Sequence, residues 1–177
     1  LSESLAEHFG LHRLEVDYSA LLALPGALRQ GEWTVTAAVR MEQEILAVFP
    51  GAVEEAYGLA IDVGSTTVAG YLCSLRTGQI VGTESFMNPQ ITFGDDVIAR
   101  ISYVMDNPDG MDKMRGVIID GLNHLLRTVT GDHDLSPADI LEITIVGNTV
   151  MHHLLLGIDP RALGFSPFTP AVHRSLD

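Results

Sequence analysis

Residues 58–70 read GLAIDVGSTTVAG, and this stretch governs how the rest of the chain is interpreted. An apolar strand ends near the carboxylate of Asp62, a tight turn begins at Gly64, and a second apolar strand follows. Three hydroxyl residues complete the turn: Ser65, Thr66 and Thr67. A carboxylate beside several free backbone N–H groups can hold a magnesium-bound water and phosphate oxygens in one place. The stretch therefore predicts a phosphate-binding hairpin in which Asp62 contacts magnesium through water.

A plain β-hairpin is the alternative interpretation, and these residues alone leave both open. In the alternative, Gly64 and Ser65 occupy the turn for conformational reasons and Asp62 caps it locally. Two other nucleotide-binding motifs are missing from the sequence. G-x-x-x-x-G-K-[ST] does not occur, and no G-x-G-x-x-G follows a predicted strand, which disfavours the two folds that carry them.

Composition and charge exclude several classes of protein. The chain is 46% hydrophobic and 19% charged, as folded globular proteins are, and has neither a membrane-length apolar run nor a visible signal peptide. The net charge of −13, with Lys113 as the only lysine, argues against binding to nucleic acid or anionic lipid. Cys73 is the only cysteine, so this chain alone cannot form a disulfide or ligate an iron–sulfur cluster through cysteines. A reducing cytoplasm fits this cysteine usage best.

The chain is predicted to divide into two parts near residue 56. Residues 1–56 read as a small α/β unit, with helices at 4–9 and 19–29 and strands at 33–40 and 44–49. Residues 57–177 begin with a three-strand meander and continue with helices and a fourth strand. The predicted strands are 59–63, 67–75, 79–86 and 140–146, the helices are 97–105, 111–130 and 150–156, and an extended tail covers 165–170.

A second candidate binding segment joins the fourth predicted strand to the last helix. Gly147, Asn148 and Thr149 occupy this junction, where backbone N–H groups at a helix start can meet an anion. Alternatively, Asn148 or Thr149 is only the N-cap of the helix. The adjacent His152 and His153 project about 100° apart on a helix, so they do not form a metal-binding pair.

Two further polar segments have structural and functional interpretations. In the loop 88–96, Asp95 and Asp96 suit the start of a helix, yet the loop's amide side chains could also face a cleft or a partner. The segment 132–134, DHD, follows a glycine and reads as a solvated turn rather than a metal cluster.

Four motifs in order give the chain a family resemblance. They are Asn88-Pro89-Gln90, GDDVIARI at 94–101, VGNTVMHHL at 146–154 and Gly157-Ile158-Asp159-Pro160. Together they are similar to the reductive activators of corrinoid-dependent methyltransfer proteins. The meander with its hairpin also resembles the first subdomain of the actin, sugar-kinase and heat-shock-chaperone ATPase superfamily. The resemblance therefore implies an α/β fold with a ribonuclease H-like mixed sheet and helices, beside a small α+β N-terminal part.

The family resemblance implies an activity and residue roles. ATP hydrolysis would be coupled to electron transfer from an iron–sulfur cluster, returning an inactive cobalt(II) corrinoid to cobalt(I). By position, Asp62 would take the magnesium-water role, and Gly64 with Ser65, Thr66 and Thr67 the phosphate role. The segment Gly147, Asn148 and Thr149 would lie beside the γ-phosphate, with Asn148 helping to place the attacking water. Asp62 and Asn148 are thus the candidate catalytic residues.

The resemblance also implies which parts of the site this chain supplies. Residues 1–56 would be the end of a middle domain, and residues 57–177 an incomplete first subdomain of an ATPase domain. The iron–sulfur domain, a second phosphate loop and the adenosine pocket would lie outside the chain, so alone it is expected to bind ATP feebly. The implied partner is a corrinoid protein or a corrinoid-dependent methyltransferase, and a homodimer is compatible with the resemblance.

Two other functions remain open from the sequence. The first is a small-molecule kinase of the same superfamily, acting on a sugar or an acid. The second is a binding module without catalysis, in which the hairpin at 58–70 is only structural.

Overall fold

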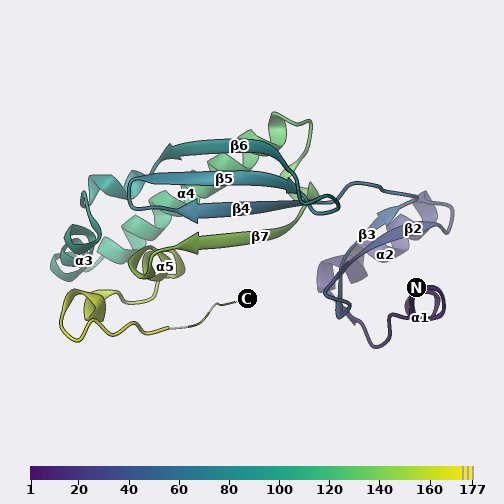
Figure 1. Cartoon of the computed structure of the whole chain (residues 1–177), viewed down its shortest axis with the longest axis horizontal. Coiled ribbons are helices and arrows are strands. Elements are labelled where there is room, and N and C mark those ends of the chain that lie inside the picture. The colour runs from purple at the N-terminus through teal and green to yellow at the C-terminus, as the bar shows by residue number, and fades with distance from the viewer. Residues whose placement is uncertain (173, 175, 177) are drawn as a thin grey trace. The chain divides into compact units, whose positions relative to one another are not determined.

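The computed structural model describes residues 1–172, 174 and 176. The chain forms two compact units, residues 1–56 and 57–177, each with its own sheet and hydrophobic core (Figure 1). The division follows the acidic pair Glu54 and Glu55, where the sequence turns into an apolar strand. Within the described part of the chain, no helix is long and apolar enough to cross a bilayer.

The first unit is a three-stranded sheet with two helices. Its elements are α1 Ser2–Phe9, β1 Glu15–Val16, α2 Tyr18–Gln30, β2 Val35–Arg40 and β3 Glu44–Pro50. The strand order is β1-β3-β2, with β1 parallel and β2 antiparallel to β3. Asp17 is the N-cap of α2, and its carboxylate accepts the Ser19 N–H at 2.7 Å. Its small core contains Ala20, Ala27, Ile45 and Val48.

The second unit is built on a mixed four-stranded sheet. Its strands are β4 Tyr57–Val63, β5 Thr67–Ser74, β6 Ile80–Met87 and β7 Ile140–Gly147, in the order β6-β5-β4-β7. The first three are antiparallel neighbours, which confirms the predicted meander, and β7 runs parallel to β4. The mixed α/β architecture expected from the sequence is therefore present.

Helices complete the second unit. They are the α-helices α3 Val97–Asp106, α4 Gly110–Gly131 and α5 Thr149–Leu156, with the 3-10 helices η1 Pro89–Thr92, η2 Pro137–Asp139 and η3 Arg161–Gly164. The prediction of an extended tail over residues 165–170 is wrong in its first half. There the chain makes a turn in which the Phe168 N–H donates to the Phe165 carbonyl at 2.6 Å.

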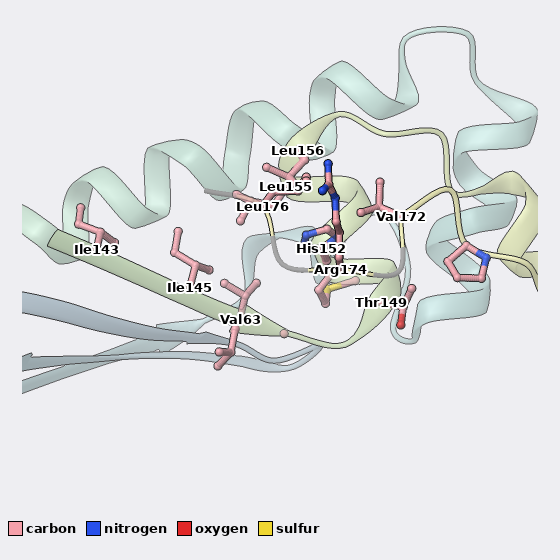
Figure 2. A pocket seen from close by; sticks show the side chains of 14 residues that line it. Val63, Ile143, Ile145, Thr149, His152, Leu155, Leu156, Val172, Arg174 and Leu176 are labelled. Atoms are coloured by element: carbon pink, nitrogen blue, oxygen red, sulfur yellow. The ribbon is translucent and has the colours of Figure 1, made fainter. Parts of the chain in front are cut away.

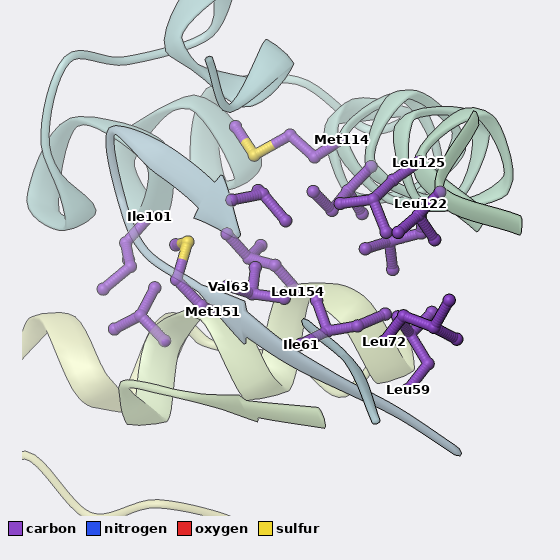
Figure 3. Packing of buried hydrophobic residues seen from close by; sticks show 14 residues of the cluster. Leu59, Ile61, Val63, Leu72, Ile101, Met114, Leu122, Leu125, Met151 and Leu154 are labelled. Atoms are coloured by element: carbon purple, nitrogen blue, oxygen red, sulfur yellow. The ribbon is translucent and has the colours of Figure 1, made fainter. Parts of the chain in front are cut away.

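The core of the second unit lies between one face of the sheet and the helices α3, α4 and α5 (Figure 3). Helix α4 approaches β5 closely because Gly70 has no side chain; a Cβ there would lie 2.5 Å from Leu125 Cδ2. Leu125 and Leu154 are completely buried. Truncating either leucine to alanine is expected to cost about 2–5 kcal/mol of unfolding free energy.

The opposite face of the sheet carries the candidate site residue of β4. Ile61 and Val63 point into the core, so the alternation of a strand places Asp62 on the other face, where it is exposed. Tyr71 of β5 is also exposed on this face. The fold thus presents the Asp62 carboxylate away from the hydrophobic core.

Candidate phosphate site at the carboxyl ends of β4 and β7

The two candidate segments predicted from the sequence meet at one edge of the sheet. In the parallel pairing of β4 with β7, Asp62 is opposite Val146 and Val63 is opposite Gly147. Figure 1 shows the arrowheads of β4 and β7 at the same end, next to α5. The hairpin turn and the start of α5 therefore leave neighbouring strands side by side, at the edge where open α/β sheets bind ligands.

Asp62 is free to interact with a ligand at this edge. Its carboxylate has no hydrogen-bond or ion-pair partner among the residues that the structure describes. Those residues also contain no cluster of three or more histidine, cysteine, aspartate or glutamate side chains that could hold a metal. A single exposed carboxylate can accept hydrogen bonds from the waters of a hydrated cation such as magnesium.

The carbonyl groups of the hairpin turn are all bonded to the protein interior. Asn88 supplies two donors: its side-chain Nδ2 donates to the Gly64 carbonyl at 2.7 Å, and its backbone N–H donates to the Thr66 carbonyl at 2.8 Å. The guanidinium of Arg100 donates to the Ser65 carbonyl. The Thr67 carbonyl accepts the Gly64 N–H at 3.0 Å, closing the turn.

The N–H groups of the same turn are left for a ligand. In a trans peptide the N–H points opposite to the carbonyl of the preceding residue, so the inward Gly64 and Ser65 carbonyls direct the Ser65 and Thr66 N–H groups outward. Neither N–H has an acceptor in the described ranges of the chain. Successive outward N–H groups form an anion-binding concavity, so the geometry suits a phosphate oxygen.

The turn is so tight that only glycine fits at position 64. A Cβ at this position would lie 2.6 Å from the Thr67 carbonyl oxygen, closer than real Cβ contacts permit. Beyond it, Ser65 is half-buried and Thr66 and Thr67 are exposed, so these side chains are accessible from solvent. The turn thus combines a tight backbone with accessible polar groups.

At the other segment, Asn148 serves as the N-cap of α5. Its Oδ1 accepts the Val150 and Met151 N–H groups, each at 3.0 Å. The capping interpretation is thereby the one that the geometry supports for Asn148. Gly147, Asn148 and Thr149 are all exposed, and the Asn148 Nδ2 has no acceptor within the described residues. The side chain can therefore still donate one hydrogen bond to a ligand.

The two adjacent histidines have structural surroundings. His153 is completely buried, and its Nε2 accepts the Ala171 N–H at 3.1 Å. Because Nε2 is an acceptor, Nδ1 carries the hydrogen and donates to the Thr149 carbonyl at 2.7 Å. His152 is half-buried. His153 thus fixes the C-terminal segment to α5.

Sequence reasoning missed three buried polar residues behind the turn. Asn88, Gln90 and Arg100 are at most 1% exposed. The loop that contains the first two was left undecided between a capping role and a binding role. Asp96 does cap α3, accepting the Ala99 N–H at 2.8 Å. The burial of Arg100 could have been predicted from the sequence, because helical spacing places it on the same side of α3 as the apolar residues of that helix.

A cavity of about 550 Å³, with apolar and polar lining residues, lies beside this edge on the helix side of β7 (Figure 2). Six of its lining residues are Val63, Ile143, Ile145, Leu155, Leu156 and Val172. Register places Ile143 and Ile145 on the core face, whereas Asp62 lies on the opposite one. Asp62 and the turn residues 65–67 are not among the residues that line it. Gly147 and Thr149 do line it, so the cavity adjoins the β7–α5 side of the candidate site and not its hairpin side.

The fold and this edge define a mixed α/β protein with a candidate anion site between a hairpin turn and a helix start. Residues 57–177 match the family described as RACo middle region, and residues 1–55 match the family described as RACo linker region. The chain therefore belongs to the RACo family. The resemblance to reductive corrinoid activators that the four sequence motifs carried is confirmed at this level.

Two similar proteins support the assignment. The chain is 37% identical over 112 residues to the corrinoid activation enzyme RamQ of Eubacterium limosum, covering 63% of this chain and 19% of that protein. A solved structure described as a reductive activator for corrinoid, iron–sulfur protein aligns with a TM-score of 0.80 and 36% identity. That alignment covers 96% of this chain and 28% of the solved one. The chain thus spans under a third of either relative.

The family descriptions also bear on the names of the two units. They place the middle region at residues 57–177 and a linker region at residues 1–55. The interpretation of the sequence gave the term middle domain to residues 1–56 instead. In the family's terms, the candidate phosphate site belongs to the middle region.

Proposed function

We propose that this chain forms one wall of an ATP site in a protein that reductively activates corrinoid proteins. The observation that carries the proposal is the hairpin turn, where the Ser65 and Thr66 N–H groups point outward and the Asp62 carboxylate has no partner among the described residues. Family membership and the two named activators support the corrinoid part of the proposal. In this proposal, residues 57–177 act as the first subdomain of an actin-like ATPase domain.

Each segment of the edge has a role in the proposed site. Asp62 would accept a hydrogen bond from a magnesium-bound water, and the turn N–H groups and hydroxyls would bind phosphate oxygens. The junction at 147–149 would face the γ-phosphate from the neighbouring strand. Because the Asn148 Oδ1 is committed to the helix cap, Asn148 could contribute only by donating from Nδ2. It therefore cannot serve as a general base.

The redox step would depend on an iron–sulfur cluster, which the residues of this chain cannot hold by themselves. In the proposed reaction, ATP hydrolysis accompanies the transfer of one electron from an iron–sulfur cluster to a cobalt(II) corrinoid, which becomes cobalt(I). Cys73 is the only cysteine here, so the cluster would be held by another part of the protein. The proposed partner is a corrinoid protein or a corrinoid-dependent methyltransferase, in a reducing cytoplasm, with a homodimer as one arrangement to test.

Asp62→Asn in the full-length protein tests the ATP site. We expect ATP hydrolysis to fall by about a hundredfold or more, because the metal-water contact loses its charge while the positioning of phosphate remains. Stability should change little, since Asp62 is exposed and has no partner in the described residues. Steady-state ATPase assays and urea unfolding measure the two effects.

A matched control is Glu142→Gln. Glu142 is an exposed carboxylate on the same face of the sheet, at the other end of β7, so ATP hydrolysis should be unchanged. Full ATPase activity in Asp62→Asn would contradict the proposal and leave the hairpin as a structural element. ATP consumption that needs a sugar or an acid as phosphate acceptor, without cobalt reduction, would instead indicate a kinase.

A further inference from the structure

Arg100 is the most deeply buried charged side chain behind the candidate site, at 0% exposure. Its Nε donates to the Gly94 carbonyl at 3.0 Å and its Nη2 donates to the Ser65 carbonyl. Its Nη1 lies 3.1 Å from the Met151 sulfur and 3.5 Å from the Gln90 Oε1. Within the described residues, every one of these acceptors is neutral.

Such a side chain is expensive to keep in a core. Removing a cation from water costs several kcal/mol unless an opposite charge or good hydrogen bonds compensate, and apolar residues often replace such groups without loss of stability. Burial lowers the pKa of the Arg100 guanidinium, and the carboxylates of Asp96 and Asp95 oppose that shift. An arginine nevertheless stays protonated in proteins, so a permanent positive charge lies behind the turn. Packing alone does not account for it.

We propose that Arg100 is a positioning residue of the phosphate site. By holding the Ser65 carbonyl inward, it keeps the N–H of the same peptide, that of Thr66, pointing outward to the ligand. Its charge also lies one peptide away from the bound anion, where the low-dielectric interior screens it little. This inference rests on the proposed function, since it names a residue that shapes the same site.

The same side chain also connects the two halves of the edge. Met151 belongs to the first turn of α5, whose N-cap is Asn148, and its sulfur accepts from Arg100. The Asn88 Nδ2, which holds the Gly64 carbonyl, lies 3.8 Å from the same sulfur. Arg100 and Asn88 thus contact both the hairpin turn and the helix that begins at the neighbouring strand. A change at Arg100 should disturb the spacing between them.

The test compares three variants of the full-length protein: Arg100→Met, Arg100→Gln and Arg100→Lys. Methionine removes both the charge and the donors, glutamine keeps a donor, and lysine keeps the charge without the planar fork. The affinities for MgATP and for adenosine are measured by calorimetry, with urea unfolding as the check on folding. Arg115→Met is the matched control, because Arg115 is exposed on α4 and, in the part of the chain that the structure describes, donates only to the Leu155 carbonyl.

We expect Arg100→Met to weaken MgATP binding about tenfold to a hundredfold, with adenosine binding unchanged. The glutamine and lysine variants should fall between methionine and wild type, and Arg115→Met should match wild type. The ¹³C′ chemical shift of Ser65, which reports the hydrogen bond at its carbonyl, should move in Arg100→Met and not in the control. If the methionine variant does not fold, the glutamine and lysine variants carry the same comparison.

Three results would overturn the inference in distinguishable ways. Equal MgATP affinity in wild type and the folded Arg100 variants removes the positioning role alone. A parallel loss of MgATP and adenosine affinity shows that Arg100 supports only the fold. A wild-type protein that does not bind MgATP overturns the proposed function, and this inference with it.

Discussion

The hairpin turn and the β7–α5 junction reach the same edge of the sheet but are shaped by different kinds of contact. The turn depends on side chains far away in the sequence: Asn88 lies 24 residues from Gly64, and Arg100 lies 35 residues from Ser65. The junction is local, because Asn148 caps N–H groups two and three residues ahead. The turn can therefore take its shape only in the folded unit, whereas the junction can form with its helix.

This difference also determines which segment can donate backbone N–H hydrogen bonds to a ligand. In the turn, the side chains of Asn88 and Arg100 hold the Gly64 and Ser65 carbonyls inward, and the Ser65 and Thr66 N–H groups have no acceptor among the described residues. In the junction, the Asn148 cap uses the N–H groups of Val150 and Met151. We therefore expect the turn to provide most of the affinity for phosphate and the junction to contribute orientation.

The largest effect is expected from Asn88→Ala, which breaks the long-range support. The Gly64 carbonyl and the Gln90 N–H would each lose the Asn88 side-chain partner, at 2.7 and 2.9 Å respectively. Losing two such bonds should lower the unfolding free energy by about 2–4 kcal/mol, with MgATP affinity falling in parallel. Urea unfolding and calorimetry measure both.

Asn107→Ala serves as the control for Asn88→Ala. The Asn107 Nδ2 makes a local bond, to the Tyr103 carbonyl at 2.9 Å, at the half-buried end of α3. Its loss should cost about 1 kcal/mol or less and leave MgATP affinity unchanged. If the two asparagine variants behaved alike, the distinction between long-range and local support would not hold.

Gly64→Ala should have the next largest effect, since it changes the turn itself and leaves its supports in place. The added Cβ would lie 2.6 Å from the Thr67 carbonyl oxygen, so the turn must open. We expect a loss of about 1–3 kcal/mol in unfolding free energy and a MgATP affinity at least tenfold weaker, about 1.4 kcal/mol. The measurements are those used for Asn88→Ala.

Gly116→Ala is the control for the glycine substitution. Gly116 is exposed on α4, and nothing lies within 4 Å of its added Cβ. Alanine there should stabilise the unit by up to about 1 kcal/mol through helix propensity, with no change in ligand affinity. Unimpaired MgATP binding by Gly64→Ala would argue that the turn does not hold phosphate.

The smallest effects are expected at the junction, where Asn148→Ala and Asn148→Asp separate capping from ligand binding. Alanine removes the cap and should cost about 1 kcal/mol, whereas aspartate keeps an oxygen for the cap and should cost little. Both lose Nδ2, so both should slow ATP hydrolysis if that group helps to place water. A slow but stable aspartate variant would support the orienting role, and normal rates in both variants would leave Asn148 as a cap alone.

The sequence predicted the elements whose pattern is regular. The strands around Asp62 and the long helix containing Met114, Ile118 and Leu125 have clear periods of two and 3.6 residues, and both are present in the structure. Strand β1 was not predicted, because it consists of only two exposed residues, Glu15 and Val16, which are too few to show a period. The two interpretations of Asn148 differ in the hydrogen-bond partners of its side chain. These partners cannot be read from the sequence.

The support behind the turn was hidden for a different reason. Asn88 and Gln90 have the composition of a surface loop, and only tertiary packing shows that they are buried. Arg100 interrupts the apolar side of α3, which is a visible irregularity, but its acceptor at Ser65 cannot be read from α3 alone. A residue that makes a non-local hydrogen bond of this kind can interrupt the local sequence pattern, but the pattern does not identify its bonding partner.

The parallel pairing of β4 with β7 has a consequence for the order of folding. The meander of β4, β5 and β6 closes short loops, whereas bringing β7 beside β4 closes a loop that contains α3 and α4. Loop-closure entropy delays such contacts, so β7 should join the sheet late and separate from it early. Slower hydrogen exchange in β4 and β5 than in β7 would show that β7, which carries one side of the candidate phosphate site, is the first of these strands to open.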